Sequence, residues 1–344
     1  MSFQVTIEPS QHRFQIEAEQ SILQAALDAG FILPYGCRDG VCGSCKGKLL
    51  SGAVDYGKHQ GSALSLEEKR AGYALFCCAK PRTDIVIECR EIGAAKDIPI
   101  KTLPCRVQKM ERLAPDVMAL FLKLPSNERL QFLPGQYLDI LLKDGRRRSF
   151  SLANAPHDDA LLQLHLRLAP GGQFTGHVFD KMKEKDILRF EGPHGSFFLR
   201  EESDKPILFV AGGTGFAPIK SMIEHALHHA VTRPMTLYWG ARTRVDLYQT
   251  HLPELWQALG TQFNYIPVLS EAKLEDDWQG RTGLVHQAVF DDYADLSGYQ
   301  VYVCGAPAMV DVARRDFIAR RNLPPEEFFA DSFSFAADTV ATNE

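Results

Sequence analysis

The sequence predicts a multidomain α+β protein, in which a small cysteine-bearing domain precedes an antiparallel β-barrel and a doubly wound α/β domain. Three observations support this class. The chain has 344 residues, of which 45% are hydrophobic, enough for two or three separate cores. A small, polar, proline-containing stretch, "GAAKDIPIK", separates the first domain from the rest. Near Lys205, alternating apolar and polar positions give way to continuous apolar runs separated by helices, which is typical of a parallel sheet.

The first domain is expected at residues 1–93 and opens with two strand-like segments in "MSFQVTIEPSQHRFQIE". This start has neither a basic n-region nor an apolar h-region, so no secretory signal is predicted. No apolar run approaches the length that a membrane span needs. Eight cysteines without a signal favour a reducing compartment, where clustered thiols more often bind metal than form disulfides. We therefore expect a cytoplasmic protein without membrane insertion.

Three of the cysteines lie within "YGCRDGVCGSC" and have the spacing C-x4-C-x2-C. This spacing is typical of a [2Fe–2S] cluster whose fourth thiolate comes from a distant cysteine. A loop around such a cluster must turn sharply and direct backbone N–H groups at sulfur, and the glycines between the cysteines permit this. Structural zinc is the main alternative, although zinc sites usually show two C-x2-C pairs and only one is present. The three predicted ligands are Cys37, Cys42 and Cys45.

The fourth ligand is expected to be Cys77 or Cys78. Adjacent residues of an extended chain point in opposite directions, so only one of them can reach the cluster. Residues 21–57 and 72–88 together resemble a plant-type ferredoxin domain, which has a β-grasp fold. In that family the ligand lies in the pattern Leu-x-Cys-x-Ala-x-Pro, which matches Leu75 to Pro81 here. The resemblance therefore implies Cys77.

A linker is predicted at residues 94–103, and the barrel at residues 104–200. Within the barrel, "RRRSFSLANAP" contains an R-x-F-S pattern that is weak by itself. A strand with a Pro-Gly entry precedes this pattern, and a strand, a Gly-Gly turn and a helix start follow it. Backbone N–H groups at a helix start suit a pyrophosphate. The alternative is an exposed basic hairpin beside a buried phenylalanine.

These three segments, in this order, resemble the flavin-binding barrel of the ferredoxin–NADP reductase superfamily. The resemblance implies FAD rather than FMN, because the Gly-Gly turn offers a site for a second phosphate. Arg148 would pair with phosphate, Phe150 would lie against the isoalloxazine, and Ser151 would approach N5 as a catalytic residue. The family usually has tyrosine where Phe150 stands. The other residues implied to bind the flavin are Ser149, Leu166, Arg167, Gly172, Gln173 and Thr175.

The third domain is expected at residues 201–344, including a C-terminal tail. "PILFVAGGTGFAPIKSMIEH" is a buried strand, a glycine-rich turn and a helix, and "LYWGAR" and "VYVCGAP" each end another strand. Ligands of open α/β sheets bind at the carboxyl ends of the strands, where these three motifs lie. The sequence therefore predicts a nicotinamide-nucleotide site. Its expected residues are Gly213, Thr214, Gly215, Arg242, Cys304, Gly305 and Pro307.

In the same superfamily, the Cys-Gly-x-Pro stretch lies beside the nicotinamide, so Cys304 would orient that ring without acting as a nucleophile. The alternative for this cysteine is a small buried residue at a strand end. The tail "EEFFADSFSF" matches an acidic residue followed by an aromatic one, which implies a catalytic Asp331 and a Phe333 that covers the flavin. We expect NADH to be preferred, because Asp246 would repel a 2′-phosphate, although Arg242 and Arg244 leave NADPH open.

The whole chain resembles the reductase components of bacterial multicomponent oxygenases and the iron–sulfur flavoprotein reductases that serve deoxysugar dehydrases. The resemblance implies that electrons pass from NADH to FAD, to the [2Fe–2S] cluster and to a separate protein. A terminal oxygenase is the first expectation for that partner, and a deoxysugar dehydrase is the alternative. A standalone flavin or ferric reductase and a non-enzymatic redox sensor are further alternatives. The net charge is −5 and no segment is basic enough to suggest nucleic acid. We expect a monomer that meets a protein acceptor.

Overall fold

The computed structural model describes residues 2–89, 98–259, 262–273 and 277–333. The chain divides into two compact units: Met1–Pro99 with His194–Phe197, and Ile100–Pro193 with Phe198–Glu344. The predicted barrel and the predicted α/β domain thus share the second unit. The first part of the predicted linker, up to residue 97, lies outside the described residues. Its last three residues belong to a strand that begins at Lys101, so the barrel starts earlier than expected.

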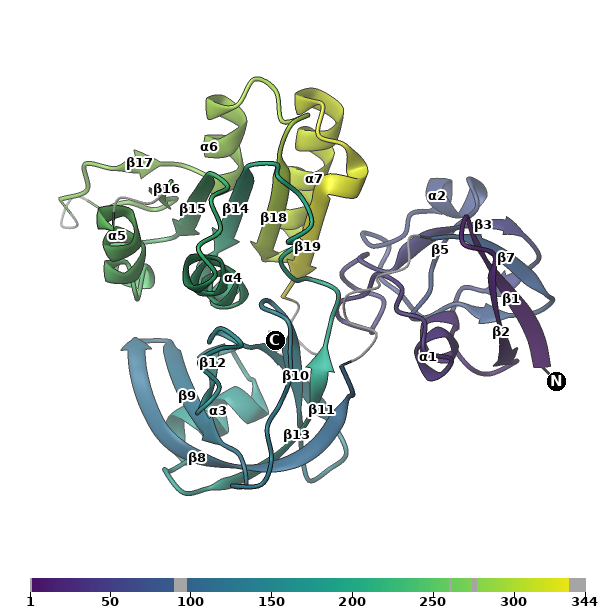
Figure 1. Ribbon diagram of the computed structural model, residues 1–344, viewed down its shortest axis with the longest axis horizontal. Helices are drawn as coiled ribbons and strands as arrows, with labels where there is room; N and C mark the ends of the chain where they lie inside the picture. Colours follow the sequence, from purple (N-terminus) through teal and green to yellow (C-terminus); the bar gives the residue numbers. More distant parts are fainter. Residues whose placement is uncertain (1, 90–97, 260–261, 274–276, 334–344) are drawn as a thin grey trace, which may run out of the picture. The chain divides into compact units, whose positions relative to one another are not determined.

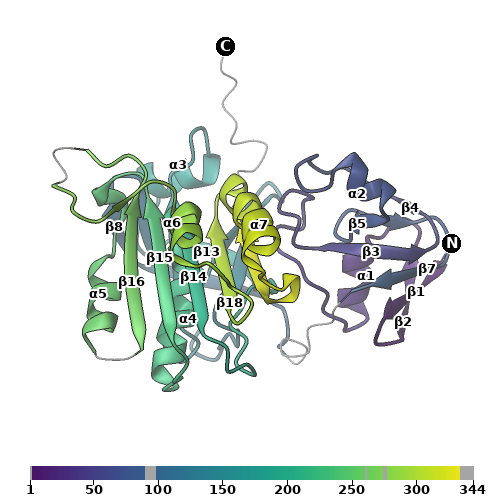
Figure 2. The same cartoon turned by 90° about the horizontal axis from the view of Figure 1, so that it is seen from above.

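The first unit contains a mixed five-stranded sheet in the order β2-β1-β7-β3-β5, with β1 and β7 parallel (Figure 2). Val5 and Ile7 of β1 are fully buried, since alternate residues of a strand face the same side. Helix α1 adds a buried apolar face, and the side chain of Ser21 caps its first turn. The elements are β1 (Ser2–Glu8), β2 (His12–Glu17), α1 (Ile22–Asp28), β3 (Lys46–Ser51), β4 (Val54–Asp55), α2 (Leu66–Arg70), β5 (Tyr73–Leu75), β6 (Lys80–Pro81) and β7 (Ile85–Glu88).

The second unit begins with a six-stranded antiparallel sheet in the order β11-β10-β13-β8-β9-β12 (Figure 1). A bridge between Leu152 and Leu164 connects the two ends of this order and closes the barrel. Every second residue of β12, beginning at Leu162, is buried in the barrel core. The elements are β8 (Lys101–Ala114), β9 (Val117–Lys123), β10 (Tyr137–Leu141), β11 (Arg147–Ser151), β12 (Leu162–Arg167), α3 (Gln173–Asp180) and β13 (Ile187–His194).

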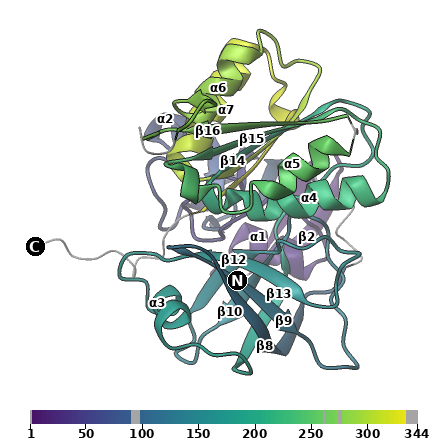
Figure 3. The same cartoon turned by 90° about the vertical axis from the view of Figure 1, so that its left-hand side faces the viewer.

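The remainder of the second unit is a parallel sheet in the order β17-β16-β15-β14-β18-β19. Helices α6 and α7 cover one face, and α4 and α5 cover the other (Figure 3). From β14 the chain proceeds to β15 on one side and later to β18 on the other, which creates a switch point at the carboxyl ends of β14 and β18. The main elements are β14 (Ile207–Gly212), α4 (Phe216–His228), β15 (Met235–Ala241), α5 (His251–Ala258), β16 (Phe263–Leu269), β17 (Arg281–Thr282), α6 (Val285–Asp292), β18 (Gln300–Gly305), α7 (Pro307–Arg321) and β19 (Phe328–Ser332).

The described part of the second unit also contains the short 3₁₀ turns η1 (Gly213–Gly215), η2 (Arg244–Asp246) and η4 (Pro325–Glu327). Turn η1 leads directly from β14 into α4, as the glycine-rich motif predicted. Within the described ranges, no helix is both long enough and apolar enough to cross a membrane.

Candidate cluster, flavin and nicotinamide sites

The predicted cluster cysteines lie together in the first unit and form two pairs. The backbone N–H of Cys37 points at the sulfur of Cys42, and that of Cys42 at the sulfur of Cys37, both at 3.4 Å. The thiols of Cys45 and Cys77 form the second pair, and this hydrogen bond raises the pKa of Cys77. Among the described residues, no three cysteine sulfurs lie within 4.8 Å of one another, which is the grouping that a single metal ion needs. Two sulfur pairs suit a two-iron cluster better than a zinc ion.

Backbone N–H groups reach the sulfurs because the loop turns sharply. The N–H of Asp39 also points at the Cys37 sulfur, at 3.4 Å. The thiol of Cys42 and these backbone groups lower the pKa of Cys37 to about 7. Gly40 and Gly43 have φ angles of 71° and 72°, as the glycine spacing predicted, and Arg38 adopts 63° without any sequence signal.

Cys78 lies beside the predicted ligand Cys77, and their sulfurs are 3.5 Å apart. The sulfur of Cys78 packs against Gly40, where an added Cβ would approach it to 2.7 Å. The thiol of Cys45 contacts Cys77 instead of Cys78. This arrangement supports Cys77 as the fourth ligand, which remains a prediction.

The predicted flavin motif lies on β11, next to the start of α3. The rings of Phe150 and Phe174 are 5.6 Å apart, and Arg146 donates a hydrogen bond to the side chain of Gln173. Arg148 and Phe150 share one face of the strand, because residues two apart point the same way. Ser149 points the other way and donates to Asp139 at 2.6 Å. The fold thus brings the predicted phosphate-binding arginine to the same side as the helix start.

The first turn of α3 suits a phosphate because no side chain caps it. Its N-cap is Gly172, at which a Cβ would lie only 2.4 Å from the hydroxyl of Thr175. That hydroxyl accepts from Ala169 N–H at 3.2 Å and donates to Gly172 C=O at 3.4 Å. The Thr175 hydroxyl therefore both accepts and donates a hydrogen bond within this turn. A direct contact from its hydroxyl to the diphosphate stays a prediction.

Two residues predicted at the flavin edge lie on opposite faces of β12. The side chain of Leu166 is fully buried in the barrel core, so only its backbone remains for a flavin contact. The guanidinium of Arg167 lies 3.2 Å from Asp116 and 3.3 Å from Asp246. A Cβ on Gly213 would meet this guanidinium at 3.0 Å. Arg167 thus connects the barrel to the glycine-rich loop, a role that the sequence did not indicate.

The glycine-rich loop and the Cys-Gly-x-Pro motif meet at the switch point of the parallel sheet. A Cβ on Gly215 would lie 2.1 Å from the carbonyl oxygen of Cys304, so only glycine fits there. Gly213 has a φ of 54°, and the indole N–H of Trp239 donates to its carbonyl at 3.0 Å. Thr214 stands between the two glycines in η1, and Pro307 begins α7. The three strand-end motifs therefore form one region, as predicted.

Cys304 is fully buried, and burial together with the nearby Asp331 raises the pKa of its thiol. A protonated thiol is a poor nucleophile, which agrees with the predicted orienting role. Asp331 pairs with Cys304 across β18 and β19, and burial raises its pKa to about 6. The N–H of Phe333 donates to the carbonyl of Gly305 at 2.8 Å. The predicted tail residues thus lie beside the Cys-Gly-x-Pro motif.

The structure changes the reason for the expected nucleotide preference. Asp246 is buried, and one carboxylate oxygen accepts from the N–H and hydroxyl of Thr243, each at 3.0 Å. Its other oxygen faces Arg167, so this carboxylate is not free to repel a 2′-phosphate as predicted. Arg242, however, lies 3.7 Å from Asp116 and 3.8 Å from Asp246. The carboxylates of Asp116 and Asp246 therefore already offset the positive charge of Arg242, with which a 2′-phosphate would have to pair.

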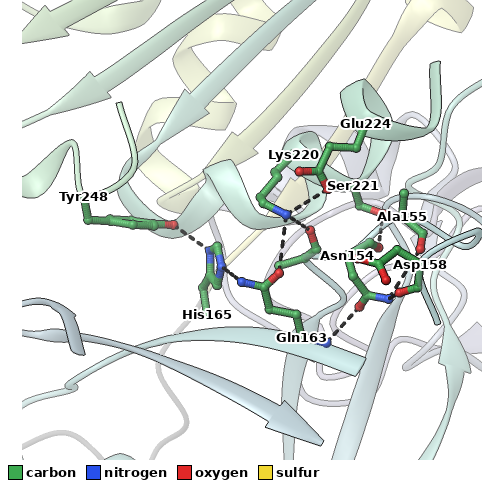
Figure 4. Close-up of polar contacts among 10 residues, drawn as sticks. Asn154, Ala155, Asp158, Gln163, His165, Lys220, Ser221, Glu224 and Tyr248 are labelled. Carbon is green, nitrogen blue, oxygen red and sulfur yellow. Dashed lines mark hydrogen bonds and ion pairs between the residues drawn. The ribbon is translucent and has the colours of Figure 1, made fainter. Parts of the chain in front are cut away.

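The sequence also missed a group of buried polar residues between the barrel and α4, shown in Figure 4. They are Asn154, Gln163, His165, Lys220 and Ser221. The only available signal was the strand alternation of β12, which places Gln163 and His165 opposite the core-facing leucines. Nothing in the sequence indicated that Lys220 would be buried, because lysine on a surface helix is ordinary.

Comparison with protein families agrees with this layout. Residues 5–82 match the 2Fe-2S iron-sulfur cluster binding domain. Residues 104–199 match the oxidoreductase FAD-binding domain, and residues 209–315 match the oxidoreductase NAD-binding domain. The order of the three domains is the predicted one.

Several characterised proteins are similar over nearly their whole length. The CDP-6-deoxy-L-threo-D-glycero-4-hexulose-3-dehydrase reductase of Yersinia pestis is 40% identical over 333 residues, which cover 97% of this chain and 99% of that protein. The reductase component of phenol 2-monooxygenase from a Pseudomonas species is 37% identical over 346 residues, 98% of this chain and 96% of that protein. The crystal structure of an Amycolatopsis cytochrome P450 reductase matches with a TM-score of 0.77 and 32% identity, over 96% of this chain and 98% of that one.

Proposed function

Because this chain belongs to the family of oxidoreductases that join a 2Fe-2S domain to FAD-binding and NAD-binding domains, we propose that it supplies a terminal oxygenase component with single electrons from NADH. The observation that carries this proposal is the pairing of four cysteine sulfurs in a domain attached to a flavin barrel and a nicotinamide fold. A reductase of small molecules has no need of such an attached domain. The eight cysteines of the chain also favour a reducing compartment, so we place the protein in the cytoplasm, and we expect it to act as a monomer.

Bound FAD would take two electrons from NADH as a hydride, and a [2Fe–2S] cluster would take them one at a time. The chain's own residues hold and orient these groups. Arg148 and the uncapped start of α3 would hold the FAD phosphates, and Phe150 would pack against the ring system. Ser151, which is buried at the end of β11, would offer its hydroxyl to the flavin.

At the nicotinamide site, Gly213 and Gly215 let the backbone approach the nucleotide phosphates. Cys304 contributes a buried, protonated thiol that excludes water and orients the nicotinamide. Asp331 lies beside Cys304 across β18 and β19, where burial raises the pKa of its carboxyl to about 6. Phe333, whose N–H donates to the carbonyl of Gly305, would cover the flavin in the absence of the nucleotide.

A deoxysugar dehydrase is the second candidate for the partner, and the 40% identity to the Yersinia reductase favours it. The two candidates can be separated by reconstitution. The purified protein would be mixed with NADH and either a phenol-type oxygenase component or a hexulose dehydrase, each with its substrate. Product formed only with the oxygenase component supports the first candidate, and product formed only with the dehydrase replaces it with the second.

The purified protein should contain one FAD, two irons and two acid-labile sulfides per chain, since four thiolates in two pairs match a two-iron cluster. Metal analysis, sulfide determination and chromatography of the released flavin measure these quantities. Zinc in place of iron would contradict the cluster assignment, and FMN in place of FAD would contradict the assignment of α3 to a second phosphate.

NADH should show a higher kcat/KM than NADPH, because two carboxylates already compensate Arg242. Asp116→Asn removes one of them and should raise kcat/KM for NADPH by about two- to fivefold, the range of an exposed ion pair. Asp159→Asn breaks a comparable pair with Arg129 elsewhere in the barrel and serves as the matched control. Steady-state kinetics with both nucleotides measure the ratio. A wild-type preference for NADPH, or an equal shift in the control, would contradict this explanation.

A further inference from the structure

A buried lysine connects the two parts of the second unit. Lys220 lies in the second turn of α4 and is only 5% exposed. Its ammonium donates to the Glu224 carboxylate at 2.8 Å, to the Ala153 carbonyl at 3.0 Å and to the Gln163 side-chain oxygen at 3.4 Å. A buried ammonium is costly unless its hydrogens find acceptors. Here three acceptors are present, and two of them belong to the barrel.

The hydrogen bonds continue from Lys220 across the face of β12, as Figure 4 shows. The amide of Gln163 lies 3.0 Å from Nε2 of His165, and Nδ1 of His165 lies 3.1 Å from the hydroxyl of Tyr248. Because an ammonium can only donate, the Gln163 oxygen accepts and its amide nitrogen donates to His165. Nδ1 of His165 therefore carries the hydrogen and donates to Tyr248.

The His165 ring is neutral throughout the physiological pH range. A neutral ring is required because Nε2 accepts a hydrogen bond while Nδ1 donates one. Burial, reinforced by the charge of Lys220, lowers the pKa of His165 to about 3. We call Glu224, Lys220, Gln163, His165 and Tyr248 the interdomain polar chain. The hydroxyl of Ser221 also bridges α4 and the barrel, since it donates to the carbonyl of Asn154 at 2.7 Å.

On both sides of the boundary, residues in contact with the interdomain polar chain lie close to predicted cofactor residues. Ala153 follows Ser151, the predicted flavin neighbour, by two residues. On the other side, α4 begins directly after the glycine-rich loop Gly213–Gly215. The ring of Tyr248 packs against Trp239 at 5.2 Å, and the Trp239 indole holds the carbonyl of Gly213. A shift of α4 along the barrel would therefore move the glycine-rich loop relative to the flavin motif.

We propose that Lys220 is a positioning residue for hydride transfer, which fixes α4 and its glycine-rich loop against the flavin barrel through the interdomain polar chain. Interfaces between domains of one chain allow relative motion unless specific contacts prevent it. Hydride transfer is sensitive to such motion, since the reacting atoms must lie about 3–3.5 Å apart and a misplacement of about 1 Å can cost about 100-fold in rate. The proposal rests on the proposed function only for the step from NADH to flavin.

The test compares Lys220→Met with wild-type holoenzyme in anaerobic stopped-flow mixing with NADH. Methionine keeps the length of the side chain but removes its charge and its donors. We expect the limiting rate of flavin bleaching to fall by about 10- to 100-fold, while the apparent Kd for NADH changes by less than about threefold. The FAD content and the flavin midpoint potential should stay at wild-type values.

A second readout needs no turnover. Hydrogen–deuterium exchange of the oxidised protein without NADH should accelerate in segments 153–165 and 216–224 of Lys220→Met, because both lose their shared anchor. The matched control is Lys205→Met, which breaks an ion pair with Glu327 at 2.8 Å within the NAD-binding domain. This control should leave the limiting rate and the exchange of those two segments unchanged.

A limiting rate within twofold of wild type, or unchanged exchange in both segments, would overturn the proposal. An equal loss in Lys205→Met would do the same, because the effect would then be a general loss of stability. If Lys220→Met does not fold, Gln163→Met keeps Lys220 paired with Glu224 and Ala153 and should still slow the limiting rate. A wild-type protein whose flavin NADH does not bleach would contradict the proposed function instead.

Discussion

Replacing Cys45 with serine is expected to stop electron delivery to cytochrome c without stopping the reduction of a hydride-accepting dye by NADH. Cys45 is buried and its thiol contacts Cys77, so serine places a harder oxygen in a site built for sulfur. Loss of a hydrogen bond to a metal ligand lowers metal affinity by about 10- to 100-fold. Loss of the ligand itself should lower the affinity further. Iron content should fall to near zero, and cytochrome c reduction by about 100-fold or more.

Cys78→Ser is the matched control for this experiment. It makes the same chemical change beside the site, at a sulfur 3.5 Å from that of Cys77. If Cys77 is the fourth ligand, Cys78→Ser should keep its iron and its cytochrome c activity. Cluster loss in Cys78→Ser with retention in Cys77→Ser would reverse the ligand assignment. A Cys45→Ser protein that has no iron but reduces cytochrome c at the wild-type rate would favour direct delivery from the flavin.

Arg148→Ala should lower both activities together, because it removes the predicted phosphate partner and the flavin should dissociate. A hydrogen bond between charged groups contributes about 1.5–3 kcal/mol, so FAD should bind about 10- to 150-fold more weakly. Titration of the apoprotein with FAD, followed by flavin fluorescence, measures this change. Excess FAD should restore the dye activity and the cytochrome c activity in parallel, since the cluster lies in the other unit.

Arg147→Ala is the control for Arg148→Ala. Arg147 is the same residue type one position earlier on β11, and its side chain pairs with Glu191 on the opposite face of the strand. We expect this variant to bind FAD like the wild type. Equal weakening in both variants would show that the net charge of the hairpin, rather than the position of Arg148, holds the flavin.

Features that depend on a few neighbouring residues could be predicted from the sequence. The cysteine spacing indicated the cluster because the ligands of one loop must lie a few residues apart. The change from alternating to continuous apolar runs indicated the barrel and the parallel sheet, since the side-chain period of a strand follows from its backbone. The glycine-rich motif also indicated a strand that turns directly into a helix, whereas the close approach of Gly215 to the carbonyl oxygen of Cys304 came only from the structure.

Only the tertiary structure decided which distant charges meet. Asp116, from the turn before β9, compensates Arg242 and contacts Arg167, whose guanidinium also reaches Asp246 and so connects the barrel to the α/β part. Nothing in the sequence indicated that Lys220 would be buried, yet its ammonium donates to the carbonyl of Ala153 and to the side chain of Gln163. The physical reason is that Coulomb attraction and hydrogen bonding depend on distance in space, whereas a sequence pattern records only distance along the chain.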